Sequence, residues 1–140
     1  MGLDVVDVAG FEQRLEADPA LVDATFTPGE RADADFGDGA DRVRRLAGRF
    51  AAKQAFLKAW SASRYGRPPA LTRVDLRAIE VRLDGQGRPA IVLHGEVAEE
   101  VAALGVQLEL RGDVATHVSI SHDGGIAAAV VLLSATPLAG

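Results

Sequence analysis

Apolar residues recur at steps of three and four between about residues 41 and 62, which is the period of one face of a helix. Leu46, Phe50 and Leu57 lie on this face. The loop at 64–69 contains two consecutive prolines, which lack the amide hydrogen that a helix needs. The pattern therefore predicts one long amphipathic helix that ends before the loop.

Alternating apolar and polar residues predict a set of strands in the rest of the chain. They are expected at 3–8, 78–83, 90–93, 106–110, 117–121 and 127–133. Turn residues at 84–87 join the second and third strands into a hairpin, and those at 123–125 join the last two. Such short connections favour antiparallel pairing.

Shorter helical segments complete the pattern. Residues 11–15 predict a short helix, and Thr27-Pro28-Gly29-Glu30 has the cap, the first-turn proline and the acid of a helix start. Residues 96–104 predict a helix that stops at Gly105. The segment 31–40, rich in Ala, Asp and Gly, is expected to be poorly fixed.

The fold class that follows is α+β, with the long amphipathic helix packed on a mainly antiparallel sheet. At 140 residues, 48% of them hydrophobic, the chain is large enough for one core and too short for two ordinary domains. We therefore expect a single domain over residues 1–140.

Composition excludes several classes of function. Without cysteine the chain has neither a disulfide framework nor thiolate chemistry. The net charge of −5 argues against a general nucleic-acid binder. The sequence has no run of about 18 apolar residues and no basic region at its start, so we expect no membrane association, no export and a cytoplasmic protein.

Positive charge is concentrated in the long helix. From Asp41 to Trp60 six basic residues accompany a single acid, so this segment carries +5 and the rest of the chain −10. Such a segment suits a site for anions. A solvated helix face with its counter-charges elsewhere would have the same composition, so spacing must decide between the two.

Polar residues that could take part in binding or catalysis occur in the first strand and along the long helix. Asp4 lies in an otherwise apolar strand, where a carboxylate needs a cation, backbone donors or solvent; it could equally cap a helix. Gln54 and Lys58 are one helical turn apart on one face, and Arg49 and Lys53 belong to an adjoining stripe. The alternative is that the neighbouring aromatic residues are core and the bases extend outward from it.

A third group lies in the strand around residue 119. His117, Ser119 and Ser121 face one way along this strand, while the apolar residues between them face the other. Imidazole and hydroxyl groups suit phosphate oxygens as donors, and His122, followed by Asp123, could titrate near neutrality. Any of these side chains could instead pair only with backbone.

Five strings of residues follow one another along the chain: Gly2-Leu3-Asp4, Phe26-Thr27-Pro28-Gly29-Glu30, Leu46-Ala47-Gly48-Arg49-Phe50-Ala51-Ala52-Lys53, Gly87-Arg88-Pro89 and His117-Val118-Ser119-Ile120-Ser121-His122. Their combination resembles the holo-acyl-carrier-protein synthase family over nearly the whole chain. The resemblance implies the phosphopantetheinyl transferase fold and the Mg²⁺-dependent transfer of 4′-phosphopantetheine from coenzyme A to a serine of an acyl carrier protein, with release of 3′,5′-ADP. It also implies a cytoplasmic homotrimer with sites between subunits, in fatty acid biosynthesis.

The resemblance also assigns roles to individual residues. Asp4 is similar to the family's metal-binding aspartate, and Lys58 to the lysine placed near the coenzyme A phosphates. The candidates for contacts with coenzyme A are Arg49, Lys53, Lys58, His117 and Ser119. The candidates for assisting proton removal from the carrier serine are His122 and Asp123. Mg²⁺ prefers one or two carboxylates together with substrate phosphates, which agrees with these roles.

Gln54 departs from the family pattern. After Ala-Ala-Lys the family has a glutamate that ligates Mg²⁺, whereas Gln54 keeps a carbonyl oxygen and loses the charge. Metal affinity should therefore fall. Three explanations stay open: an active natural variant, an introduced Glu-to-Gln substitution, or a catalytically weakened or inactive protein that binds coenzyme A or a carrier.

The segment 11–16 is a second departure. The family often meets its acidic carrier through a basic early helix, but this segment carries more acid than base. The nearest basic cluster in the sequence is Arg42, Arg44 and Arg45. We therefore expect these arginines to supply part of the surface that binds the carrier.

Overall fold

The computed structural model describes residues 1–108 and 113–135. Its strands are β1 (Gly2–Asp7), β2 (Ile79–Leu83), β3 (Pro89–Leu93), β4 (Val114–Asp123) and β5 (Ile126–Ala135). Its α-helices are α1 (Val8–Ala17), α2 (Ala20–Thr25), α3 (Pro28–Asp35), α4 (Arg42–Ser63) and α5 (Gly95–Gln107). Within these ranges no helix is both long and apolar enough to cross a bilayer.

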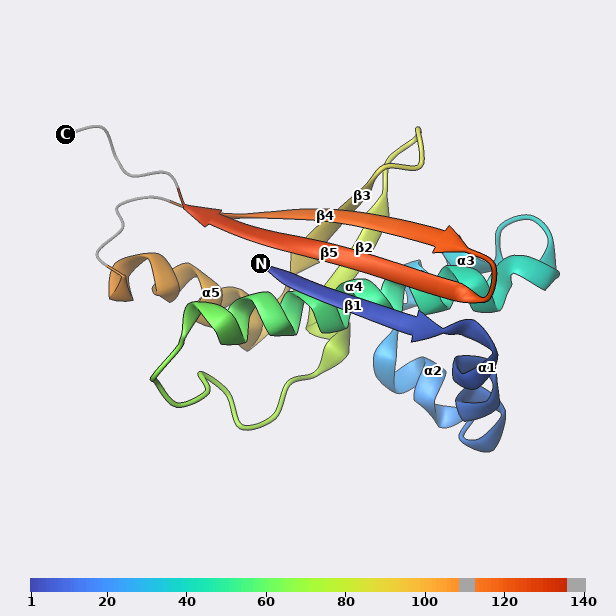
Figure 1. Cartoon of the computed structure of the whole chain (residues 1–140), viewed down its shortest axis with the longest axis horizontal. Coiled ribbons are helices and arrows are strands. Elements are labelled where there is room, and N and C mark those ends of the chain that lie inside the picture. Colours follow the sequence, from blue (N-terminus) through green and yellow to red (C-terminus); the bar gives the residue numbers. More distant parts are fainter. Residues whose placement is uncertain (109–112, 136–140) are drawn as a thin grey trace.

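The strands form two antiparallel units around α4. β5 lies between β1 and β4 in a three-stranded sheet, and β2 pairs with β3 in a separate hairpin. α4 contacts all three strands of the larger sheet, and α1–α3 and α5 lie toward its opposite ends (Figure 1). The predicted α+β class, with a long helix on a mainly antiparallel sheet, is confirmed.

Small side chains let α4 lie close to the sheet. Ala52, Ala55 and Ala59 are at most 1% exposed, and Gly48 on the same face is also buried. Residues at these spacings share one side of a helix. The seam between helix and sheet therefore has little bulk on the helix side, and the buried residues of β5 that face it are Ala127, Ala129 and Val131.

A buried ion pair joins α4 to α3 and β2. Lys53 Nζ lies 2.8 Å from Glu30 Oε1, and both side chains are fully buried. The ammonium also donates to the carbonyls of Leu76 and Ile79, at 2.8 and 2.7 Å. Glu30 Oε2 accepts a hydrogen bond from the Val81 amide. Both charges are therefore paired and hydrogen-bonded, which is the condition for burying them.

The expectation of a poorly fixed segment at 31–40 is wrong for residues 31–35, which are helical. The capping box of Thr27 and Glu30 starts α3, which continues to Asp35. Arg42 then binds Asp35 from the start of α4. These partners lie outside the segment, so its own composition did not reveal what holds it.

The strand expected at 106–110 is wrong where the structure can test it. Residues 106 and 107 are the last turn of α5, and the Leu108 amide donates to the Leu104 carbonyl at 3.0 Å. Gly105 therefore lies inside the helix rather than after its end. Residues 109 and 110 lie outside the described ranges. The remaining expected strands are present with boundaries shifted by a few residues.

Lys53→Met should lower the free energy of unfolding by about 3–5 kcal/mol, because it leaves the buried Glu30 carboxylate without its cation. Lys58→Met makes the same change on the same helix, but Lys58 is 57% exposed, so its loss should cost less than about 1 kcal/mol. Urea unfolding of both variants measures the difference. Equal losses would show that the buried pair is no more important to the fold than an exposed one.

Candidate active site

Asp4 and Lys58 meet where β1 crosses α4. Alternate residues of a strand point to one side, so Gly2, Asp4 and Val6 share the face of β1 that is turned to the helix. Lys58 Nζ lies 3.0 Å from Asp4 Oδ1 and donates to the Leu3 carbonyl at 2.9 Å. The carboxylate is largely covered, whereas Lys58 is exposed. Asp4 thus has the cation that its position requires, and Lys58 remains within reach of solvent.

Gly2 makes this contact possible. A Cβ on Gly2 would lie 2.0 Å from the carbonyl oxygen of Ala55 and 2.6 Å from the amide nitrogen of Ala59, so no side chain fits. β1 therefore lies directly against the backbone of α4. The helix-capping alternative for Asp4 does not hold, since the cap of α1 is Asp7.

Gln54 lies one turn before Lys58 on the same face of α4 and is half-buried. Asp4 and Gln54 offer one carboxylate and one neutral amide oxygen. Mg²⁺ accepts such a small protein contribution when substrate phosphates and water complete its six ligands. Among the described residues no group of three or more His, Cys, Asp or Glu could hold a metal ion. The donor set therefore fits Mg²⁺ that is shared with a phosphate.

A second candidate site is a cavity of about 220 Å³ between α4, the β2–β3 hairpin and β4, and cationic side chains line it. Arg45 and Arg49 come from α4 and His122 from β4. Gly87 and Pro89 come from the hairpin. The cavity thus combines two guanidinium groups with an imidazole, a chemistry that suits phosphate.

Arg49 is the most constrained of these side chains, with 4% of its surface exposed. Its Nη1 donates to the Arg45 carbonyl at 3.1 Å, but its Nε and Nη2 find no acceptor among the described residues. Burial lowers the pKa of Arg49, while the carboxylates of Asp33 and Glu30 act in the opposite direction. A buried guanidinium with spare donors favours an anionic ligand.

His122 projects from the end of β4 toward α4. Its Nε2 lies 3.0 Å from the carbonyl oxygen of Arg44, and the ring lies beside Gly48. Asp123 is the next and last residue of β4 and is exposed. The two candidates for proton removal are therefore adjacent in sequence, but only His122 lines the cationic cavity.

His117 and Ser119 lie on the other face of the sheet. The alternation expected along this strand is present, because the residues between them pack against the core and these two are exposed. His117 Nε2 lies 3.0 Å from Ser134 Oγ on β5. α4 covers the opposite face, so neither residue shares a site with Asp4 within one chain.

Lys53 does not have the surroundings of a ligand-binding residue. Its three donors are taken by Glu30 and two backbone carbonyls, and the side chain has no exposed surface. A phosphate could reach Lys53 only by breaking the ion pair in the core. The structure thus gives Lys53 a structural role in place of the coenzyme A contact expected from the sequence.

α4 separates the two groups of candidate residues. Gln54 and Arg49 are five positions apart, which places them about 140° from each other around the helix axis. Asp4 lies on β1, His122 lies on β4, and β5 runs between these strands. One copy of the chain therefore keeps the acid and amide group apart from the cationic cavity.

Arg45, Gly87 and Pro89 line the cavity but were not among the residues expected to be catalytic or to bind coenzyme A or metal; Arg45 was expected only in the carrier surface. A signal for each was present: Arg45 belongs to the basic cluster, and the other two belong to one of the strings that carry the family resemblance. Spacing alone could not show that the hairpin packs beside the start of α4, because that contact is long-range.

The comparison with protein families shows which superfamily the chain belongs to. The family model of the 4′-phosphopantetheinyl transferase superfamily matches residues 1–129, and the chain belongs to this superfamily. The holo-[acyl-carrier-protein] synthase of Mycobacterium ulcerans is 41% identical over 133 residues, which cover 95% of this chain and 94% of that protein. The resemblance found in the sequence is confirmed.

Solved structures give the same result. A Chronobacterium ammoniagenes acyl-carrier-protein synthase in complex with coenzyme A matches with a TM-score of 0.83 at 42% identity, over 96% of each chain. The Mycobacterium tuberculosis acyl carrier protein synthase matches with a TM-score of 0.74 at 40% identity, again over 96% of each chain. The fold is thus shared along almost its whole length with these enzymes.

Gly2→Ala should lower the free energy of unfolding by about 1–3 kcal/mol, because the added methyl group forces β1 away from α4. The same shift would separate Asp4 from Lys58 and reduce any activity that needs both. Gly39→Ala is the matched control, since a Cβ there meets nothing within 4 Å. Thermal unfolding measures both variants; a Gly2→Ala protein as stable as Gly39→Ala would contradict the close approach.

Proposed function

We propose that this protein transfers the 4′-phosphopantetheine arm of coenzyme A to a serine of an acyl carrier protein. The observation that carries the proposal is the Asp4–Lys58 pair, placed beside Gln54 in a chain of this transferase superfamily. The named relatives support the carrier protein as the acceptor, and the Chronobacterium complex supports coenzyme A as the donor.

The reaction forms a bond between the serine oxygen and the phosphorus that bears the pantetheine arm. It breaks the bond from that phosphorus to the bridging oxygen, so 3′,5′-ADP leaves, and the serine proton passes to a base or to water. Little covalent chemistry is asked of the protein, which must position the groups and offset charge. Lys58 supplies a mobile positive charge for the pyrophosphate, and Arg49 supplies a fixed one for a second anionic group.

Asp4 and Gln54 would hold Mg²⁺, which when bound neutralises charge on the phosphate oxygens. Asp4 provides the only full negative charge in this donor set. We therefore propose weak Mg²⁺ affinity in the free protein and tighter binding together with coenzyme A. His122 and Asp123 remain the proposed acceptors of the serine proton, with His122 the better placed because it lines the cationic cavity.

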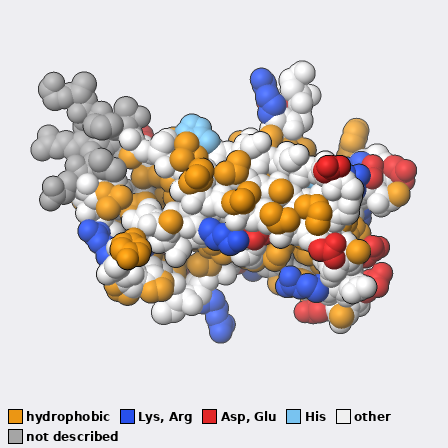
Figure 2. Space-filling model, in the orientation of Figure 1, with side chains coloured by type: hydrophobic (Ala, Val, Ile, Leu, Met, Phe, Trp, Pro, Cys, Tyr) orange, Lys and Arg blue, Asp and Glu red, His pale blue; other side chains and the backbone are white. Residues whose placement is uncertain are grey.

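We propose a homotrimer in which neighbouring copies complete each site. The separation of Asp4 from Arg49 by α4 supports this assembly, because a second copy can bring the missing half. The outer face of the sheet also supports it. Leu3, Val5 and Leu132 are 59%, 58% and 47% exposed there, and hydrophobic side chains gather over β1 and β5 (Figure 2). Apolar surface of this kind marks association sites.

His117 and Ser119 have a place in this proposal only through that assembly. They lie on the same outer face as the exposed apolar side chains, so they could contact coenzyme A held by a neighbouring copy. A single transferase domain over residues 1–140, a cytoplasmic location and a role in fatty acid biosynthesis are proposed on the family resemblance.

Gln54 favours a second candidate function. A neutral amide in place of a carboxylate weakens the metal site, so the chain could bind coenzyme A and the carrier with little turnover. The two candidates differ in product formation rather than in binding.

Intact-mass analysis of an apo carrier protein incubated with this chain, coenzyme A and Mg²⁺ tests the function. We expect a mass gain of one phosphopantetheine, and a several-fold faster gain at low Mg²⁺ with Gln54→Glu, because the added charge raises metal affinity. Gln107→Glu adds the same charge at the exposed end of α5 and should leave the rate unchanged.

Each outcome of this assay separates the candidates. No gain from the unmodified chain and clear gain from Gln54→Glu would identify a weakened variant. No gain from either protein with several carriers would overturn the transferase proposal. Equal rates and equal Mg²⁺ dependence in all three proteins would contradict the role given to Gln54.

Arg44 is the proposed carrier contact among the basic residues at the start of α4. Arg42 pairs with Asp35, and Arg45 donates to the carbonyls of Ala34 and Asp38, whereas the described contacts include no ion pair for Arg44. Its charge is therefore the most available of the three for an acidic partner.

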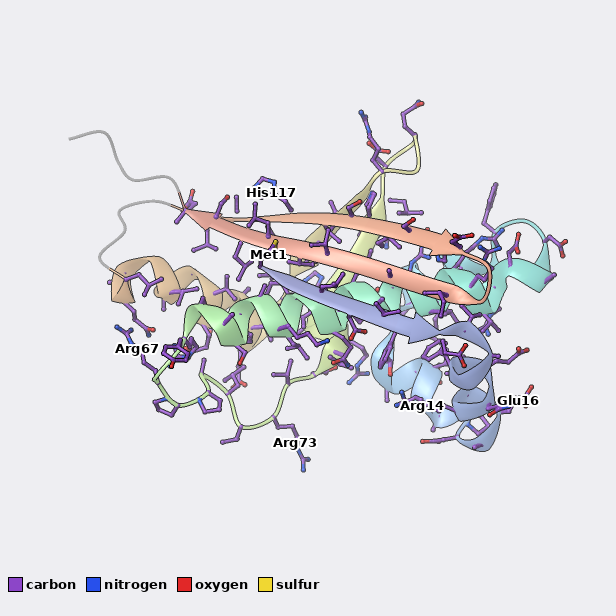
Figure 3. The ribbon with its side chains drawn as sticks, viewed as in Figure 1. Met1, Arg14, Glu16, Arg67, Arg73 and His117 are labelled. Carbon is purple, nitrogen blue, oxygen red and sulfur yellow. The ribbon has the colours of Figure 1, made fainter. Side chains whose placement is uncertain are left out.

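Arg44→Glu should raise the KM for the carrier about tenfold at low salt and less at high salt, while the KM for coenzyme A stays within twofold. Arg73→Glu makes the same charge reversal on the exposed loop between α4 and β2 (Figure 3) and serves as the control. An unchanged carrier KM for Arg44→Glu would place the carrier surface elsewhere.

A further inference from the structure

Gly48 is an unfavourable residue for its position. It lies inside α4 and is buried, yet glycine is among the weakest helix formers and loses the most backbone freedom on folding. The surrounding positions are alanines, for example Ala47, Ala51 and Ala52. Alanine would favour the helix here too, so glycine at this position needs a separate reason.

The imidazole of His122 supplies that reason. A Cβ on Gly48 would lie 2.7 Å from His122 Nε2 and 3.0 Å from its Cε1, with Ile120 Cγ2 at 3.1 Å. These are all side-chain atoms of β4. Gly2, in contrast, meets the backbone of α4, so its role is the approach of strand and helix. The absence of a side chain at Gly48 therefore makes room for the His122 imidazole, not for the backbone of a neighbouring element.

The hydrogen bond between the His122 ring and the backbone of α4 determines the tautomer of the ring. His122 Nε2 lies 3.0 Å from the carbonyl oxygen of Arg44. A carbonyl oxygen only accepts hydrogen bonds, so Nε2 must carry the hydrogen. In the neutral ring the lone pair is then on Nδ1. A methyl group at position 48 would displace the ring and, with it, this hydrogen bond.

We infer that Gly48 is a positioning residue: it lets His122 rest on α4 in the Nε2–H tautomer and so keeps Nδ1 as the nitrogen that meets the substrate. This inference rests on the proposed function for the identity of that substrate, the carrier serine. The proton released by the serine oxygen would pass to Nδ1 and give an imidazolium ion. Arg45 and Arg49 line the same cavity as His122.

The tautomer can be read directly from long-range ¹H–¹⁵N spectra of the labelled protein, with His122→Gln to assign the signal. We expect the Nε2–H pattern for His122 in spectra of the unmodified chain recorded at alkaline pH. Gly48→Ala should shift the signal toward a mixture of tautomers. An unchanged Nε2–H pattern in Gly48→Ala would overturn the inference.

Stability gives a second readout that does not depend on activity. Gly48→Ala should leave Tm unchanged or lower it in the unmodified chain, since the methyl group meets the ring. In a His122→Ala background the two closest contacts, both with the imidazole, are gone and only Ile120 Cγ2 remains near, at 3.1 Å. The same substitution should then raise Tm by about 3 °C through helix propensity. An equal rise in both backgrounds would mean that His122 does not need the glycine.

Kinetics tests the link to function. Gly48→Ala should lower kcat for carrier modification at least tenfold with the KM for coenzyme A within about twofold, and it should have no further effect in His122→Gln. An additional tenfold loss in that background would contradict action through His122. If neither the unmodified chain nor Gln54→Glu modifies any carrier, the proposed function fails, while the spectra and the Tm values still decide the positioning role.

Discussion

The close contact between α4 and the three-stranded sheet is the constraint on which the other features depend. It requires small residues on both sides, and the chain provides alanines along one face of α4 together with Gly2 on β1. A helix held at a larger distance would leave Asp4 beyond the reach of Lys58 and His122 away from the Arg44 carbonyl. Close packing of small side chains between α4 and the sheet thus positions Asp4, Lys58 and His122, which lie at the edges of this contact.

α4 also separates two groups of candidate site residues. Asp4, Gln54 and Lys58 lie along one flank of α4, where an acid, an amide and a mobile cation suit a metal shared with phosphate. Arg49 and His122 lie on the other flank, where fixed cations suit a second anion. Coenzyme A carries a pyrophosphate and a separate 3′-phosphate, and we propose that each of these anionic groups binds at one of the two flanks. Separation within one chain is therefore an argument for a site shared between copies.

Much of this could be predicted from the sequence, for identifiable reasons. The period of α4 and the alternation along β4 are local patterns, and they gave correct faces for Lys58 and Ser119. Lys53 could not be placed, because its partner Glu30 is distant in sequence and nothing in the stripe of bases shows which member is buried. Gly105 was expected to end a helix, but α5 continues past it to Gln107.

Long-range packing also decided which candidates share a site. Asp4 and Lys58 come together, as a carboxylate in an apolar strand required. His117 faces away from them, although it resembles a cleft residue of the same family, because α4 covers only one side of the sheet. A sequence pattern identifies the face of a strand on which a residue lies, but not which neighbouring element or which copy of the chain that face meets.

Co-purification of two inactive variants tests the shared site most directly. Asp4→Asn removes the acid from one flank of α4, and Arg49→Met removes the fixed cation from the other. Each variant alone should fail to modify an apo carrier protein, and mixed oligomers isolated through two different tags should recover part of the activity, because some sites receive both intact halves. Mixed oligomers that form but stay inactive would contradict a site built from two copies, as would full activity in a protein shown to be monomeric.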